Sequence, residues 1–178
     1  MLAHLFTQAC LLAVGLASVN TAFHPPHTKP FLSVDFLAGW PSNVTTPNGL
    51  VAMTPNAGGN VTGGVTGTII GNVSSSTETF LHLNETDKAV SEYVNQFIFV
   101  DEGGNDFLVK MSGFATYGDG SIHGFAHVNL QTGKPKMEWV NYAIFIGEWT
   151  GAMDSGTGLA KLDIFKVSSG GLREKTEN

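Results

Sequence analysis

The stretch MEWVNYAIFIGEW (residues 137–149) decides how this chain folds, together with two similar runs that precede it. These runs are DFLVKMSGFATY (residues 106–117) and SIHGFAHVNL (residues 121–130). All three are rich in aromatic and β-branched residues, and glycine or proline turn residues bound each of them, which is the pattern of strands in one antiparallel sheet. We therefore predict three consecutive strands here.

The rest of the chain supplies further strand-like runs and hardly any helical pattern. These runs occupy residues 31–40, 50–54, 65–70, 79–83 and 159–167, and a further run from Asn95 leads into the meander of the first three. A poorly capped helical turn could begin at Thr86. The total is about eight to ten short strands, and closing the sheet on itself is the usual way to remove its two edges. The sequence predicts an all-β fold, a single antiparallel up-and-down β-barrel with little helix; a two-sheet sandwich is the alternative.

Glycines are frequent between residues 49 and 73. A phosphate-binding loop would need a following Lys-Ser or Lys-Thr pair and a helix, and neither follows these glycines. Bulges and tight bends that let a sheet curl are the better interpretation.

The N-terminus has the pattern of a secretory signal. An apolar run at residues 10–16 is followed by small residues, which favours cleavage after Ala17 or Ala22. A membrane anchor is the alternative, but the run is shorter than the roughly 20 apolar residues that a spanning helix needs. We expect a signal peptide at 1–22, a Pro-rich arm at 23–30, the barrel domain at 31–167 and a polar tail at 168–178. The expected location is the secretory-pathway lumen or the exterior of the cell.

Cysteine usage and glycosylation motifs agree with that compartment. Cys10 is the one cysteine and lies in the leader, so the mature chain would have no thiol for a disulfide, a nucleophile or a metal site. Sequons predict glycosylation at Asn43, Asn60, Asn72 and Asn84, in segments that would then face solvent.

The charge pattern excludes two classes of partner. The formal net charge is −6 and no basic run is present, so neither nucleic acid nor an anionic membrane surface is an expected partner. No Gly-x-Ser-x-Gly nucleophile elbow occurs either. We expect a small apolar or aromatic ligand, without a cofactor or a metal.

Several short motifs resemble a known family. They are the Gly58-Gly59 turn, Gly64 and Gly67 before Ile69-Ile70, the turn Thr132-Gly133-Lys134-Pro135, and Trp139-Val140-Asn141 ahead of Phe145-Ile146-Gly147. Over about residues 50–167 the chain resembles small bacterial and fungal proteins of a domain family of unknown function with a lipocalin-like, calycin-type barrel. Its secreted, sequon-bearing form looks more like fungal proteins of tropolone-sesquiterpene pathways, which act as hetero-Diels-Alder cyclases.

The chain also departs from that family. Members are commonly leaderless and carry Arg near the Trp-x-Asn strand, whereas this chain has only Lys134 and Lys136 between residues 129 and 138. An anion-binding role for Arg is therefore not carried over. The resemblance implies a barrel pocket and, for the closer group, a cofactor-independent pericyclase.

Strand alternation suggests which residues would line such a pocket. Asn141 shares one face of its run with three aromatic residues, and an amide among aromatic rings could donate hydrogen bonds to a ligand oxygen. A structural amide that satisfies backbone groups is the equal alternative for Asn141. The predicted aromatic lining consists of Phe36, Trp40, Phe125, Trp139, Phe145 and Trp149.

Three further polar residues are candidates for catalysis. His123 and His127 lie four apart on a strand and hence about 13 Å apart, so together they do not chelate one ion, but each could act in acid–base chemistry. Lys110 could stabilise an oxyanion. The alternatives are exposed or satisfied sheet histidines and a lysine whose stem packs along apolar surface.

The function predicted from these features is a hetero-Diels-Alder cycloaddition of a tropolone quinone methide with a humulene-type alkene. Holding two reactants in alignment can supply roughly 7–11 kcal/mol of barrier reduction, so aromatic walls and one or two polar groups would suffice. A non-catalytic carrier of small hydrophobic ligands is the alternative, and a structural or interaction protein is a third. Because both faces of the run at 137–149 are largely apolar, a second subunit could cover one of them as a homodimer.

Overall fold

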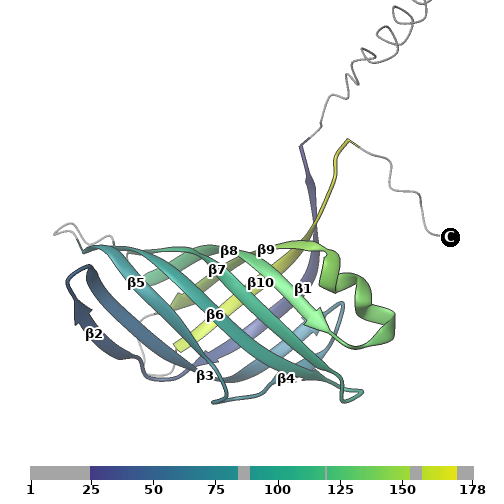
Figure 1. Ribbon diagram of the computed structural model, residues 1–178, viewed down its shortest axis with the longest axis horizontal. Coiled ribbons are helices and arrows are strands. Elements are labelled where there is room, and N and C mark those ends of the chain that lie inside the picture. Colours follow the sequence, from purple (N-terminus) through teal and green to yellow (C-terminus); the bar gives the residue numbers. More distant parts are fainter. Residues whose placement is uncertain (1–24, 84–88, 119, 153–157, 172–178) are drawn as a thin grey trace, which may run out of the picture. The chain divides into compact units, whose positions relative to one another are not determined.

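The computed structural model describes residues 25–83, 89–118, 120–152 and 158–171. In these ranges the chain forms ten β-strands and one 3-10 helix, shown in Figure 1. The elements are β1 (His27–Ala38), β2 (Ser42–Thr46), β3 (Gly49–Gly63), β4 (Gly67–Ile69), β5 (Ser75–Leu83), β6 (Ala89–Asp101), β7 (Asp106–Gly118), β8 (Ser121–Thr132), η1 (Pro135–Tyr142), β9 (Ile144–Ala152) and β10 (Gly158–Ser168). The expected signal peptide lies outside the described residues, and so does Thr86, the start of the helical turn that the sequence allowed.

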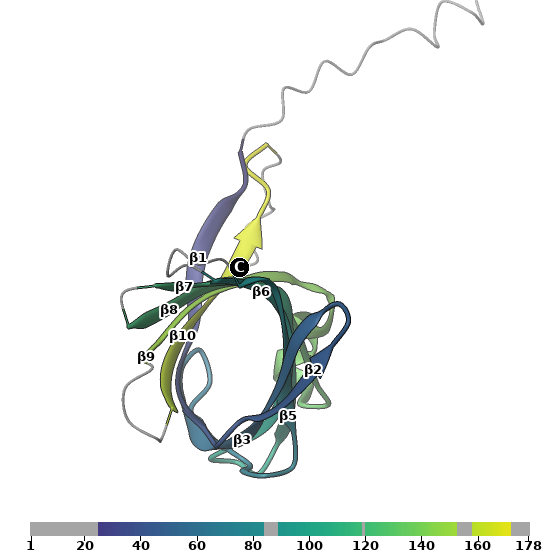
Figure 2. The same ribbon diagram turned by 90° about the vertical axis from the view of Figure 1, so that its left-hand side faces the viewer.

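The strands close into a ring (Figure 2). From β5 to β10 each strand pairs antiparallel with the next one in the chain. β3 pairs with both β5 and β1, and β1 neighbours β10, so the sheet returns to its starting point. Side-chain contacts from Ser33 to Asp163 and from Asp35 to Lys161 mark an antiparallel register across that last seam. The predicted antiparallel up-and-down barrel is confirmed, and the alternative of a two-sheet sandwich is wrong.

Two compact units are distinguished along the chain. The barrel is Thr28–Ser168, and the other unit comprises residues 1–27 and 169–178. Of the second unit the structure describes 25–27 and 169–171, where the Gly171 amide donates a hydrogen bond to Ser169 Oγ at 3.2 Å. β1 begins at His27, so its first residues lie in the segment predicted as a Pro-rich arm. No helix in the described ranges is long and apolar enough to cross a membrane.

Part of the predicted strand at 137–149 is helical. Residues 135–142 form η1, and β9 starts only at Ile144, so the prediction is wrong for residues 137–142. Pro135 stands in the first turn of η1, where its fixed φ suits a helix start. Val140 is buried at 1% exposure, and the Asn141 side chain bonds the main chain of Thr132. These contacts fold the segment back onto the end of β8.

Glycines let β3 bend where it meets β1. The register between these strands slips by one residue, because Leu37 pairs with Gly58 whereas Ala38 pairs with Asn56. Gly59 has a φ of +141°, and a Cβ there would lie 2.2 Å from the Asp35 carbonyl oxygen. Only glycine tolerates both conditions at this position. The register shift leaves Ala57 as the extra residue of a β-bulge in the glycine-rich segment, as predicted.

Phenyl rings fill one end of the barrel interior. Phe97, Phe99, Phe107 and Phe145 are at most 2% exposed, and the rings of Phe99 and Phe107 stack with centroids 4.7 Å apart. Buried aliphatic side chains complete this layer: Val34, Val61, Val109, Leu130 and Ile164. Fully burying such a side chain contributes roughly 1.5–3 kcal/mol, so this end is the stable core of the fold. The open space lies toward the other end.

Candidate functional site

A cavity of about 160 Å³ lies inside the barrel beyond the phenyl layer. Its lining comes from β1, β3 and β5 to β10, close to the ends of β1, β7 and β9 and the starts of β5, β8 and β10. The lining residues are Phe36, Ala38, Thr54, Ser76, Glu78, Tyr93, Asn95, Phe97, Met111, Tyr117, Ile122, Trp149, Gly151, Ala152, Gly158, Leu159, Ala160 and Leu162. Glu78 is the one charged residue in this described lining.

The cavity has a polar wall and an apolar wall. Thr54 on β3, Ser76 on β5 and Asn95 on β6 are cross-strand partners and form one polar row. Glu78 and Tyr93 are partners in an adjacent row. The opposite wall is built by apolar side chains and glycines of β1, β8, β9 and β10. A ligand with one polar edge and one apolar face fits this arrangement.

Glu78 is held by two hydroxyl groups. Ser91 Oγ and Tyr117 Oη both donate hydrogen bonds to Glu78 Oε1. Ser91 is fully buried, whereas Glu78 and Tyr117 are half-buried. Burial raises the pKa of Tyr117 far above its ordinary value, and the hydrogen bond to Glu78 and the negative charge of that carboxylate raise it further. Tyr117 therefore stays a neutral hydrogen-bond donor at physiological pH.

Tyr93 and Trp149 form a second polar pair beside Glu78. Trp149 Nε1 donates to Tyr93 Oη at 2.6 Å, and their rings meet edge to face with centroids 5.4 Å apart. Tyr93 Oη in turn donates to the Phe125 carbonyl oxygen at 3.2 Å. Burial raises the pKa of Tyr93 to about 12, although the bond from Trp149 opposes the shift; the charge of Glu78 adds to it.

Small residues make room for the Trp149 ring. A Cβ at Gly124 would lie 2.4 Å from Trp149 Nε1 and 2.7 Å from Cε2. The indole therefore lies directly on the backbone of β8. Glycine at 124 fixes the place of Trp149 in the cavity wall.

Asn56 anchors the polar wall from the side of the bulge. It is 1% exposed, and its Nδ2 lies 2.8 Å from Ser74 Oγ, 2.9 Å from Asn95 Oδ1 and 2.7 Å from the Gln96 carbonyl oxygen. These contacts join β3 and β6 to Ser74, the residue that precedes β5. They also hold the Asn95 side chain at the cavity.

The six aromatic residues predicted to line the pocket do not lie together in the structure. Phe36 and Trp149 line the cavity, and Phe145 lies in the phenyl layer with no exposure. Trp40 and Phe125 are 75% and 57% exposed and do not reach the cavity. Trp139 lies on η1, where it packs edge-on against Phe31 with ring centroids 5.3 Å apart, and Lys166 Nζ lies 4.7 Å from its ring centroid.

The predicted polar site residues lie outside the cavity. Asn141 Oδ1 accepts a hydrogen bond from Thr132 N at 2.8 Å, and Asn141 Nδ2 donates to the Thr132 carbonyl oxygen at 3.0 Å. Its amide thus satisfies backbone groups, which is the alternative interpretation that the sequence left open. Asn141 borders a shallow groove with Gln131, Gly133 and other residues, separate from the barrel cavity.

Lys110, His123 and His127 point to the outer surface of β7 and β8, where all three are exposed. His123 Nε2 forms an ion pair or hydrogen bond with Glu148 Oε1 at 2.8 Å, and both side chains are 48% exposed. Inward positions of β8 hold Ile122, Gly124 and Ala126 instead. Within the described ranges no group of three or more His, Cys, Asp or Glu could hold a metal ion.

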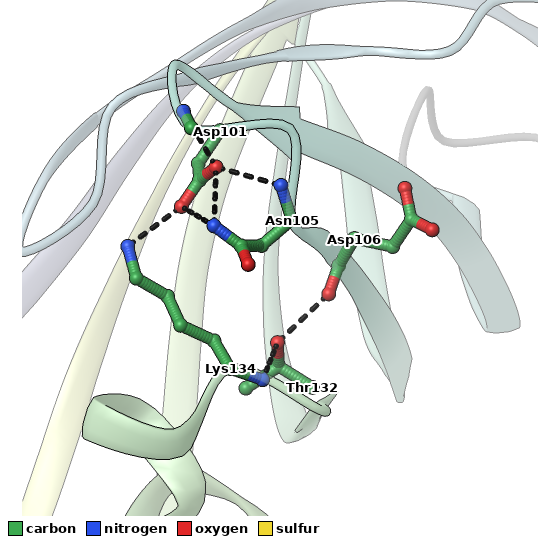
Figure 3. A network of polar contacts seen from close by, with 6 residues as sticks. Asp101, Asn105, Asp106, Thr132 and Lys134 are labelled. Atoms are coloured by element: carbon green, nitrogen blue, oxygen red, sulfur yellow. Dashed lines mark hydrogen bonds and ion pairs between the residues drawn. The ribbon is translucent and has the colours of Figure 1, made fainter.

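A second polar network lies at the phenyl-filled end (Figure 3). Asp101 Oδ1 accepts from the amides of Gly103 at 2.9 Å and Asn105 at 2.8 Å, and Lys134 Nζ lies 2.6 Å from Asp101 Oδ2. The bonds from Lys134 and Asn105 hold the pKa of Asp101 well below its usual range. The network ties the β6–β7 turn to the turn before η1, so Lys134 has a structural partner.

The predicted glycosylation sites lie on the surface where the structure describes them. Asn43, Asn60 and Asn72 are exposed. Asn84 lies outside the described residues.

Sequence reasoning missed Glu78, Ser91, Tyr93 and Tyr117. Glu78 lies in a segment rich in Ser and Thr, and such a polar pattern is also typical of a strand exposed to solvent. One signal was available, since Ser91, Tyr93, Asn95 and Phe97 alternate on one face of β6. That face mixes polar and aromatic residues, as the wall of a ligand cavity does.

No protein-family model matches the chain, and no curated protein matches it in sequence. Solved structures do resemble it. A conserved protein of unknown function from Rhodopseudomonas palustris has a TM-score of 0.66 and 17% identity, covering 82% of this chain and 99% of its own. A β-barrel-like protein from Acinetobacter baumannii has a TM-score of 0.58 and 13% identity, covering 83% and 100%. An enzyme from Penicillium herquei has a TM-score of 0.53 and 15% identity, covering 84% and 100%. These likenesses establish the barrel fold.

Proposed function

We propose that this protein is a cofactor-independent enzyme that binds a small ring compound in the barrel cavity and promotes a cycloaddition. The cavity beside Glu78, with its polar wall facing an apolar one, is the observation that supports it. One structural neighbour, from Penicillium herquei, is described as an enzyme, which supports the proposal of a catalytic role. We place the protein in the secretory pathway, glycosylated at its exposed sequons.

The reaction that the resemblance implies is a hetero-Diels-Alder addition of a tropolone quinone methide to a humulene-type alkene. The cavity volume of about 160 Å³ is below the roughly 300–1,000 Å³ of ordinary ligand pockets, so it holds one single-ring reactant. In this proposal the tropolone ring lies in the cavity. The larger alkene approaches at the mouth, which Leu159 marks because it lines the cavity and is 61% exposed.

Alignment of the two reactants provides most of the acceleration in this mechanism. Fixing reactants in a near-attack geometry can supply roughly 7–11 kcal/mol. The Trp149 indole and Phe36 hold the ring by contact, while the Glu78 carboxylate accepts a hydrogen bond from a hydroxyl group of the ring. In this proposal Glu78 takes the polar role that the sequence assigned to Asn141, His123, His127 and Lys110.

The test is incubation of the purified protein with a hydroxymethyl tropolone, which forms the quinone methide by loss of water, and a humulene-type alkene. We expect product to form faster and with higher stereoselectivity than in buffer. Ala160→Phe, which fills the cavity, should abolish the acceleration, whereas Lys161→Phe places the same ring on the outer face and should leave it intact. Equal rates and selectivity with and without protein would exclude this activity.

A non-catalytic carrier is the second candidate, because the hydrogen-bond donors around Glu78 already bond to protein acceptors. Ser91, Tyr117 and Trp149 each donate to a protein acceptor rather than to open space. A carrier would retain a ring ligand without converting it. Glu78→Gln would then change the affinity and have no rate to reduce.

A further inference from the structure

We infer that the ligand of the cavity is a hydrogen-bond donor, with an O–H or N–H group that binds the Glu78 carboxylate. This inference rests on the proposed function, since it specifies which ring compounds the cavity accepts. The sequence predicted a donor, the Asn141 amide, whereas the group proposed here is an acceptor.

The hydrogens of the polar cluster around Glu78 are all in use. A serine or tyrosine hydroxyl carries one hydrogen, and those of Ser91 and Tyr117 are both directed at Glu78 Oε1. The Tyr93 hydrogen is directed at the Phe125 carbonyl oxygen, and the indole hydrogen of Trp149 at Tyr93 Oη. No donor of this cluster is left for a ligand.

What the cluster still offers is acceptors. An ionised carboxylate accepts about four hydrogen bonds, and two are made at Oε1 of Glu78. The second oxygen, Oε2, has no hydrogen bond within the described part of the chain. A ligand carbonyl, ether or carboxylate placed there would meet like polarity, whereas an O–H or N–H group completes the shell.

The surroundings restrict the ligand further. The Glu78 carboxylate is the one charge in the described lining, and the aromatic rings of Tyr93, Tyr117 and Trp149 lie around it. The row of Thr54, Ser76 and Asn95 can serve a second polar atom on the same edge of the ring. A phenol, an enol or a protonated amine on a single ring has this chemistry; the amine would also gain cation–π contacts.

The experiment is calorimetric titration of the full-length protein near pH 7 with phenol, anisole and toluene, which differ in one substituent. We expect phenol to bind at least about tenfold more tightly than anisole or toluene, which is 1.4 kcal/mol. Benzylamine is a further arm that separates neutral from charged donors, and tighter binding than toluene would support the inference.

Variants then locate the acceptor. Glu78→Gln should reduce the preference for phenol over anisole to less than about threefold. Glu92→Gln removes a carboxylate from the outer face of the neighbouring strand and should keep the preference. The comparison among ligands needs only the natural protein, so it tests the preference for a hydrogen-bond donor even if Glu78→Gln does not fold.

The outcomes separate the two claims. If all rings bind with equal affinity, or anisole binds best, the donor inference is wrong while binding in the cavity stands. If no ring compound binds at millimolar concentration, the proposed function fails and the inference with it. A preference for phenol that survives in Glu78→Gln would overturn the assignment of the acceptor.

Discussion

Replacing Gly124 with alanine tests how the cavity wall is built. The added Cβ would lie 2.4 Å from Trp149 Nε1 and 3.0 Å from the Phe114 carbonyl oxygen, whereas comfortable carbon contacts are about 3.5–4.0 Å. The indole must therefore move by about 1 Å, which breaks its hydrogen bond of 2.6 Å to Tyr93 Oη.

The cost follows from these two effects. Overpacking costs about 1–3 kcal/mol and the lost hydrogen bond about 0.5–1.5 kcal/mol. The lower entropy of the unfolded chain with alanine returns about 0.4–1 kcal/mol. We expect Gly124→Ala to lower the free energy of unfolding by roughly 1–4 kcal/mol in urea titrations, and to weaken binding of ring ligands.

Matched variants isolate the cause. Gly133→Ala changes the same atoms where nothing lies within 4 Å of the new Cβ, and its stability should stay within about 0.5 kcal/mol of the natural protein or rise slightly. Trp149→Phe removes the N–H without adding volume and should cost about 1 kcal/mol from the hydrogen bond, apart from any loss of ring contacts. If Gly124→Ala were as stable as Gly133→Ala, with unchanged ligand affinity, the position of the Trp149 ring would be wrong.

Three further predictions concern titration and the predicted site residue Asn141. The pKa of Tyr93 is raised to about 12 and that of Tyr117 is also raised, so their stabilising contribution is complete below about pH 10 and is lost as pH rises through 12. Ultraviolet absorbance of tyrosinate should show two tyrosines that ionise late in the folded protein and near pH 10 in denaturant. Normal titration of all tyrosines in the folded protein would contradict their burial. The pKa of Asp101 is lowered, so its contribution to the free energy of unfolding is present above about pH 4 and is lost as pH falls below that value. Lys134→Met should reduce this loss of unfolding free energy below pH 4, whereas the exposed control Lys136→Met should not. Equal pH profiles for the two variants would show that the ion pair is unimportant. Asn141→Ala removes two hydrogen bonds to Thr132 and should lower the free energy of unfolding by about 1–3 kcal/mol without changing ligand affinity. A changed affinity with unchanged stability would instead indicate that Asn141 binds the ligand.

The sequence predicts the barrel well, because strand periodicity and turn glycines report local backbone preferences that closure of the sheet satisfies together. It fails at residues 137–142 for a physical reason. A run of apolar residues suits either a strand or a short helix, and the choice here depends on Pro135 and on the Asn141 bonds to Thr132.

Alternation groups residues on a face but does not say which face is inside. On β8 the large residues His123, Phe125 and His127 point out, while Gly124 and Ala126 point in, because the Trp149 ring from β9 occupies the interior. The site itself depends on contacts between distant segments. Glu78 and Tyr117 are 39 residues apart in the chain, so their hydrogen bond leaves no local pattern.

Methyl-labelled protein titrated with phenol and followed by NMR would locate the bound ring. Met111, Ile122 and Leu162 line the cavity, while Val94, Ile144 and Ile146 lie on the outer surface of β6 and β9 and serve as internal controls. We predict saturable shifts of the first three methyl groups, reduced in Ala160→Phe, with the outer three unmoved. Shifts confined to the outer three, or no shifts at all, would contradict a ligand-binding cavity beside Glu78.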